Sequence, residues 1–254
     1  MRSLVTAGEQ TAHINLDLAD LAAGETLDLP AGPETAVVVL TGQVTAAAGQ
    51  TSLGTAGGRA SVFDAPGDTV YAPPGTGLQL TAVDGGAVQL AIASAAADPD
   101  PAAPAARIIT PAEQRIAEVG EGNWSRTVRT ILGPEHDAVR LLLGETINPP
   151  GNWSSYPPHR HDRHNPPEEV NLEEVYLFKV DPPGGFGVQI GYDIDGAEEA
   201  FLVRDDDIAA IRTGFHPVVA ASGYSLYYLW AMAGDGRVMI PYMDPAHVWV
   251  QQGR

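Results

Sequence analysis

Residues 151–162 read GNWSSYPPHRHD, and this stretch places two histidines two positions apart, at His159 and His161. On a β-strand, side chains two positions apart point to the same face, so both imidazoles would face one side. Pro157 and Pro158 precede the pair and favour an extended entry into such a strand. The stretch therefore predicts a strand that offers two imidazole ligands to a metal ion.

Short β segments surround this stretch on both sides. Apolar runs such as AVVVLTGQV and AVQLAIA alternate with Gly, Pro and Asp up to residue 94, and similar runs recur after residue 106. Such spacing is typical of a β-sandwich or barrel, and only PAEQRIAEV (111–119) has a pattern that suits two helical turns. The segment 94–106, SAAADPDPAAPAA, indicates a linker. We therefore expect two domains, residues 1–106 including the linker and residues 107–254.

The composition excludes several classes of protein. The 254 residues carry 14 basic and 32 acidic side chains, a net charge of −18, so we expect neither a nucleic-acid partner nor a membrane partner. There is no cysteine, so a bound metal must use histidines and carboxylates. No apolar run reaches the length of a membrane span, and no signal peptide is visible, so we expect a cytoplasmic protein.

Two further segments supply candidate ligands. EEVNLEEVY (168–176) carries carboxylates into the start of a strand, and TGFHPV (213–218) places His216 after a turn. Three neutral imidazoles and one carboxylate suit a single divalent transition metal such as Zn, Mn, Fe or Ni. A lone His-x-His in a surface loop is common without a metal, but its combination with these segments is more specific.

Several of these motifs resemble the 5-deoxy-glucuronate isomerase family of inositol catabolism. The similar segments include GNWSSYPPHRHD (151–162), NPPEE (165–169), LEEVY (172–176) and GFHPV (214–218), and the similarity extends from about residue 37 onward. The resemblance implies an all-β bicupin, with two jelly-roll barrels in one chain. The N-terminal half holds no His-x-His pair, and its one histidine, His13, lies outside the predicted strands, so we expect no metal in that barrel. The resemblance also implies four metal ligands: His159, His161, Glu174 and His216. Glu173 competes with Glu174, but a strand alternates, so only one of the two can point inward.

The resemblance implies an aldose–ketose isomerisation of 5-deoxy-D-glucuronate to 2-deoxy-5-keto-D-gluconate, assisted by the metal as a Lewis acid. A protein group would move a proton between adjacent carbons. Tyr176 and Tyr228 are candidates for this catalysis, although each also suits a core position. Arg160, Lys179 and Gln189 are candidates for contacts with a sugar-acid substrate.

Three positions depart from the family pattern. Phe178, Ile190 and Trp230 stand where the family usually has His, Arg and Asn, which predicts a more apolar pocket. A diverged metal-binding cupin acting on another sugar, an iron-dependent cupin dioxygenase and a sugar-binding protein without catalysis therefore stay open as alternatives. Exposed barrel edges usually pair, so we also expect a homo-oligomer.

Overall fold

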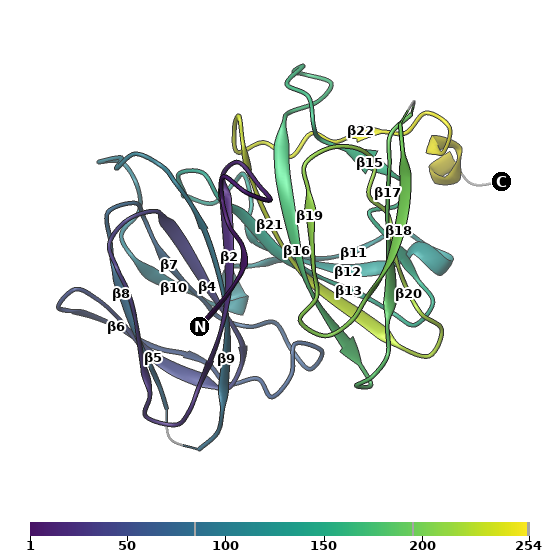
Figure 1. Ribbon diagram of the computed structural model, residues 1–254. Helices are drawn as coiled ribbons and strands as arrows, with labels where there is room; N and C mark the ends of the chain where they lie inside the picture. Colours follow the sequence, from purple (N-terminus) through teal and green to yellow (C-terminus); the bar gives the residue numbers. More distant parts are fainter. Residues whose placement is uncertain (84, 195, 253–254) are drawn as a thin grey trace. The chain divides into compact units, whose positions relative to one another are not determined.

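The computed structural model describes residues 1–83, 85–194 and 196–252, and these residues are mainly β (Figure 1). The described helices are three short 3-10 turns, η1 (Pro111–Glu113), η2 (Gly122–Trp124) and η3 (Val248–Gln252), none of which could cross a membrane. The expected all-β class is confirmed. The chain divides into two compact units, Met1–Gln114 with Ile131–Leu142, and Arg115–Thr130 with Leu143–Arg254.

Two antiparallel sheets build the first unit, with the strand orders β1-β2-β9-β4-β7-β10 and β3-β8-β5-β6. Alternating side chains of both sheets, among them Val37, Leu80 and Leu90, meet in one apolar core. The strands are β1 (Arg2–Val5), β2 (Ile14–Leu21), β3 (Thr26–Leu29), β4 (Glu34–Thr41), β5 (Gln43–Ala48), β6 (Thr51–Gly57), β7 (Thr69–Ala72), β8 (Leu78–Ala82), β9 (Val88–Ala95) and β10 (Arg107–Ile109).

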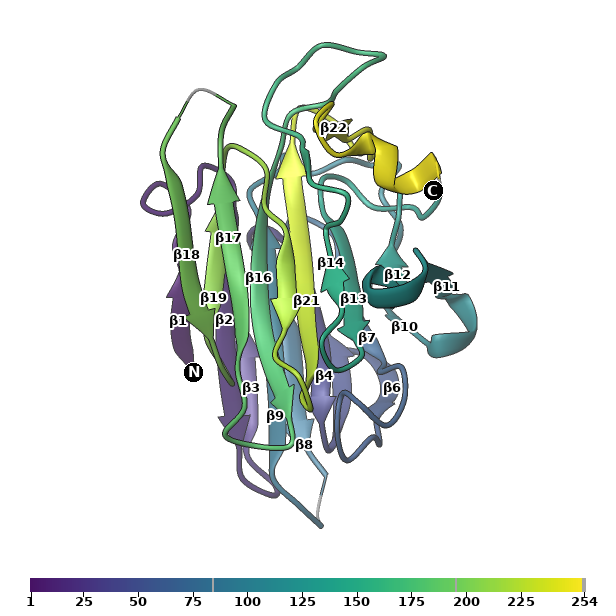
Figure 2. The same ribbon diagram turned by 90° about the vertical axis from the view of Figure 1, so that its right-hand side faces the viewer.

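The second unit has the same plan, with sheets ordered β11-β12-β13-β21-β16-β19 and β14-β20-β17-β18, and a separate pair β15-β22. Its long strands β16 and β21 run side by side along their whole length (Figure 2). The strands are β11 (Arg115–Val119), β12 (Arg126–Leu132), β13 (Leu142–Asn148), β14 (Trp153–Ser154), β15 (His159–Arg160), β16 (Leu172–Asp181), β17 (Gly187–Tyr192), β18 (Glu198–Val203), β19 (Ile208–Ile211), β20 (Val218–Ala220), β21 (Ser225–Gly234) and β22 (Tyr242–Met243).

An aromatic layer lines the inside of the second unit. Alternation along β16 puts Glu174, Tyr176 and Phe178 on one face, and the pairing with β21 sets Tyr228 opposite Phe178 and Trp230 opposite Tyr176. The rings of Tyr176 and Tyr228 have centroids 4.4 Å apart, and Phe178 packs against both. Glu174 lies on the same face of β16, two positions before Tyr176.

The chain passes between the units later than the expected boundary at residues 106 and 107. Strand β10, which begins at Arg107, pairs with β7 of the first unit, and residues 131–142 return to that unit. The segment 111–119 is not a helix of two turns. It forms η1 and then β11, because pairing of Arg115–Val119 with β12 supplies backbone hydrogen bonds that favour the strand, and isolated short helices are marginal.

Candidate metal centre

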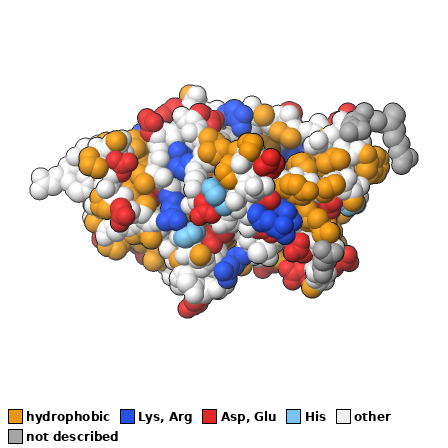
Figure 3. Space-filling view, turned by 90° about the horizontal axis from the view of Figure 1, so that it is seen from above, with side chains coloured by type: hydrophobic (Ala, Val, Ile, Leu, Met, Phe, Trp, Pro, Cys, Tyr) orange, Lys and Arg blue, Asp and Glu red, His pale blue; other side chains and the backbone are white. Residues whose placement is uncertain are grey.

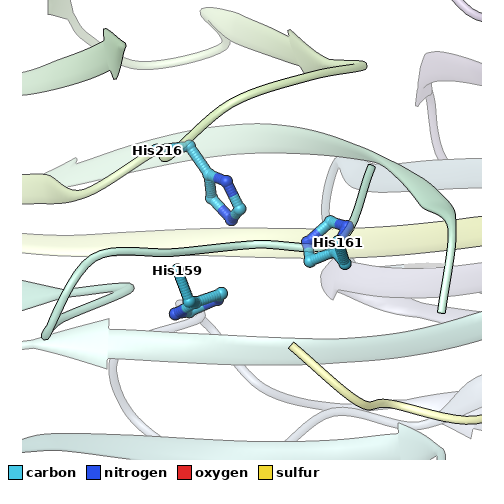
Figure 4. Close-up of side chains that lie close together, drawn as sticks. All are labelled: His159, His161 and His216. Carbon is cyan, nitrogen blue, oxygen red and sulfur yellow. The ribbon is translucent and has the colours of Figure 1, made fainter. Parts of the chain in front are cut away.

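Three histidines of the second unit converge on one space. On the face seen in Figure 3, histidine side chains lie among both basic and acidic side chains. His159 comes from β15, His161 follows that strand directly, and His216 precedes β20. Figure 4 shows the three rings facing a common space, and their ligand atoms all lie within 4.8 Å of one another.

Backbone carbonyls orient two of these rings. His161 donates from Nδ1 to the carbonyl of Leu172 over 2.6 Å, and His216 donates from Nδ1 to the carbonyl of Gly214 over 3.1 Å. A carbonyl oxygen can only accept, so each ring carries a proton on Nδ1 and turns Nε2 toward the cluster. The buried Nε2 of His216 has no hydrogen-bond partner among the described residues. An orphaned imidazole nitrogen beside two other imidazoles fits a divalent transition metal.

Glu174 completes the cluster. Its Oε2 lies 3.2 Å from Nε2 of His161 and 3.3 Å from Nε2 of His216. Burial raises the pKa of Glu174, but the two neighbouring imidazoles, His161 and His216, outweigh burial and lower that pKa to about 2. Burial and the neighbouring imidazoles hold the pKa of His159 well below its usual value. Burial also acts to lower the pKa of His161, but Glu174 raises it overall. An ionised carboxylate and a neutral His159 are the states that metal binding requires.

Acidic side chains join the two segments that carry the histidines. Oδ2 of Asp162 accepts from the backbone N–H of Gly214 over 2.7 Å, and Oε1 of Glu169 accepts from the backbone N–H of Asp162 over 2.8 Å. Gly214 has φ of +82°, and a Cβ there would lie 2.6 Å from the carbonyl oxygen of Tyr192. Only glycine suits this turn, which explains the Gly-Phe-His-Pro sequence.

A small cavity opens beside the cluster. Its volume is about 150 Å³, less than the roughly 300 Å³ of the smallest pockets for drug-sized ligands, so it suits a small molecule. The lining residues are Arg126, Val128, Thr146, Ser155, His159, Glu174, Tyr176, Tyr228, Trp230, Met232 and Met239. The lining includes one basic side chain, Arg126, which the sequence analysis did not identify as a candidate site residue.

Both expected catalytic tyrosines lie in the cavity with partners for their hydroxyl groups. Tyr176 shares a hydrogen bond of 2.9 Å with Ser155, and Tyr228 donates to Ser154 over 3.0 Å. Burial raises the pKa of Tyr228. The pKa of Tyr176 is raised well above its usual value by burial and by the negative charge of Glu174. Both phenols therefore keep their protons at neutral pH.

The three expected substrate contacts lie outside the cavity lining. Arg160 lies between His159 and His161 in the chain and instead pairs with Glu169 at 3.4 Å. Lys179 lies on the face of β16 opposite Tyr176 and pairs with Asp206. Gln189 donates from Nε2 to the carbonyl of His216 over 3.0 Å, so it holds the backbone of a candidate ligand.

Two of the three departures from the family pattern also lie outside the cavity. Phe178 is fully buried in the aromatic layer, and Ile190 lines a different hollow beside Tyr192. Only Trp230 contributes to the cavity itself. The expected apolar character of the pocket therefore comes from Trp230 and its neighbours.

Comparison with known proteins agrees with these features. The model of the KduI/IolB family matches residues 2–250. The chain belongs to the KduI/IolB family. The 5-deoxy-glucuronate isomerase of Bacillus subtilis (strain 168) is 34% identical to it over 256 residues, which cover 98% of this chain and 92% of that protein. The resemblance found in the sequence motifs is thereby confirmed.

Solved structures give the same result for this KduI/IolB member. An IolB-like protein from Salmonella typhimurium LT2 superposes with a TM-score of 0.92 at 31% identity, covering 98% of this chain and 94% of that chain. Oxalate decarboxylase of Lactobacillus farciminis superposes with a TM-score of 0.68 at 12% identity, covering 98% and 85%, which shows the fold alone. The expected bicupin fold is confirmed.

Proposed function

We propose that this chain is a metal-dependent aldose–ketose isomerase that converts 5-deoxy-D-glucuronate to 2-deoxy-5-keto-D-gluconate. The observation that carries the proposal is the similarity to a 5-deoxy-glucuronate isomerase over 98% of the chain. The cluster of three imidazoles and a carboxylate beside a small cavity supports it, because such an isomerisation benefits from a Lewis acid next to a carbonyl group.

We assign His159, His161, Glu174 and His216 to hold one divalent transition metal, with Zn, Mn, Fe and Ni as the candidates. When bound, the metal supplies polarisation of the substrate carbonyl and of the neighbouring hydroxyl. The carbonyl groups of Leu172 and Gly214 keep the ligand nitrogens aimed at it.

The tyrosines take the part of proton donors. Because Tyr176 and Tyr228 keep their protons at neutral pH, they donate to substrate oxygens and do not remove a proton from carbon; Tyr228 does so by exchanging its bond to Ser154 for one to substrate. The hydrogen bonds to Ser155 and Ser154 hold their hydroxyl oxygens in place at the cavity wall.

Turnover of 5-deoxy-glucuronate, measured with each candidate metal under air and under argon, tests the function. We expect equal isomerisation in both atmospheres, and loss of activity in a His159→Ala, His161→Ala double variant. An Arg212→Gln variant, changed at an exposed position, serves as the control and should keep full activity.

The other classes give different results in the same assay. Oxygen consumption that requires iron, without turnover of the uronate, would show the dioxygenase. Tight binding of the uronate without turnover under every condition would show a binding protein. Light scattering coupled to size-exclusion chromatography measures whether the chain forms the homo-oligomer that we expect.

A further inference from the structure

A buried cation lines the same cavity as the candidate metal ligands. Arg126 begins β12, is only 9% exposed and shares the cavity lining with His159 and Glu174. Its Nη1 donates to the carbonyls of Trp124 and Tyr156, over 3.1 and 3.2 Å. These two bonds fix the guanidinium in place. They leave Nε and Nη2 without a hydrogen-bond partner in the described part of the chain.

Arg126 differs from the other buried arginines of the second unit. Arg129 pairs with Glu145 at 3.2 Å, and Arg160 pairs with Glu169 at 3.4 Å. No carboxylate of residues 1–83, 85–194 or 196–252 lies within salt-bridge distance of Arg126. Burial lowers the pKa of Arg126, because a desolvated cation without a counter-charge is unfavourable. An anion that enters the cavity would therefore complete an ion pair there.

Two tyrosines connect the histidines with this cation. The ring of Tyr176 lies 6.3 Å from that of His216 and 4.4 Å from that of Tyr228. Both tyrosines line the same cavity as Arg126. One cavity is thus lined by Arg126, by His159 and Glu174 of the histidine cluster, and by the two tyrosines.

We propose that Arg126 binds the carboxylate of the sugar-acid substrate while the reacting carbonyl end lies at the histidines. The inference rests on the proposed function, since it takes a 5-deoxy-uronate as the substrate. Such a molecule carries its aldehyde and its carboxylate at opposite ends of one carbon chain, so its site needs two positive poles. A guanidinium matches a carboxylate with two parallel hydrogen bonds, and Nε with Nη2 form one such pair of donors.

The remaining wall of the cavity fits the same substrate. Val128, Trp230 and Met232 give it an apolar surface. A 5-deoxy acid carries an unsubstituted methylene next to its carboxylate, and this group can lie against apolar side chains without losing a hydrogen bond. A hydroxyl at that carbon would lose its hydrogen bonds to water without replacement.

Binding of a substrate analogue tests the role of Arg126 independently of turnover. The probe is the acid in which the aldehyde of 5-deoxy-glucuronate is reduced to an alcohol, which cannot isomerise, and its methyl ester is the uncharged control. Isothermal titration calorimetry on metal-loaded protein should show that Arg126→Gln weakens binding of the acid roughly 10- to 100-fold. Binding of the ester should stay within a factor of about three.

Arg126→Lys keeps a positive charge but loses the planar pair of guanidinium N–H donors. Its loss of affinity for the acid should therefore be smaller than that of Arg126→Gln. Arg126→Lys also supplies a testable protein if the Gln variant does not fold. Equal weakening of acid and ester would overturn the proposal and leave Arg126 a structural residue. Unchanged binding of the acid in both variants would overturn it as well.

Turnover separates this inference from the proposed function. If wild-type protein binds the acid through Arg126 but does not isomerise 5-deoxy-glucuronate, the isomerase proposal fails and the anchor stands. If wild-type protein isomerises the uronate and Arg126→Gln leaves KM unchanged, the anchor fails and the isomerase stands.

Discussion

Removal of the metal should destabilise the second unit selectively. The candidate ligands come from three segments, around β15, β16 and β20, which only the folded chain brings together. A metal that binds the folded state alone stabilises it by about 2.7 kcal/mol at a free concentration 100-fold above Kd. For a chain of this size, each kcal/mol shifts Tm by about 2–4 °C. We therefore expect a chelator to lower Tm by about 5–10 °C.

Scanning calorimetry of metal-loaded and chelated protein, with elemental analysis of both, measures this shift. All ligands lie in one unit, so if the units unfold separately, only the transition of the second unit should move. The His159→Ala, His161→Ala double variant should contain no metal and should not respond to the chelator. A full metal content in that variant, or a chelator shift as large as that of the wild type, would refute the assigned ligands.

Three further changes have expected outcomes. A Cβ at Gly144 would lie 2.1 Å from Cζ2 of Trp230, so Gly144→Ala should cost about 1–3 kcal/mol in urea unfolding. Combined with Trp230→Leu, its cost should be less than additive, and strict additivity would exclude the contact as the cause. Gln189→Leu removes the bond to the carbonyl of His216 and should weaken metal binding about 10- to 100-fold in a chelator competition, in contrast to an unaffected Arg212→Gln. Tyr228→Phe keeps the ring but removes the proton donor, so kcat should fall by about 10²-fold with metal content unchanged; an undiminished kcat would leave Tyr228 a core residue.

Local sequence rules predicted the parts of the site that depend on strand periodicity. The spacing of His159 and His161 placed both on one face. Alternation along the strand allowed only one of Glu173 and Glu174 to point inward, and the family resemblance selected Glu174. The same rule places Arg160 on the face opposite the two histidines, where it pairs with Glu169. The expected contact of Arg160 with substrate was therefore inconsistent with the alternation of side chains, which the sequence already showed.

The position of Arg126 could not be predicted in this way. It lies far from the His-x-His motif in the chain, and its place in the cavity depends on how β12 packs within the second unit. Arg129, in the same strand, pairs instead with the buried Glu145 of β13. A sequence does not show which of two arginines in a strand meets a carboxylate, because that choice depends on the neighbouring strand.

The net negative charge of the protein and the negative charge of its proposed substrate are compatible if the cavity is locally positive. A protein with a net charge of −18 would repel an anionic sugar unless its cavity is locally positive. Ile190, which stands where the family usually has Arg, lines a different hollow, so this departure does not remove a positive charge from the cavity. Within the cavity, Arg126 and a metal at the histidines would supply two positive poles, and the surrounding acidic surface would leave them as the attractive sites for a uronate. Substrate specificity would then depend on two features of the cavity. The distance between the two positive groups would select the length of the substrate, and the apolar side chain of Trp230 would favour a substrate whose middle carries few hydroxyl groups.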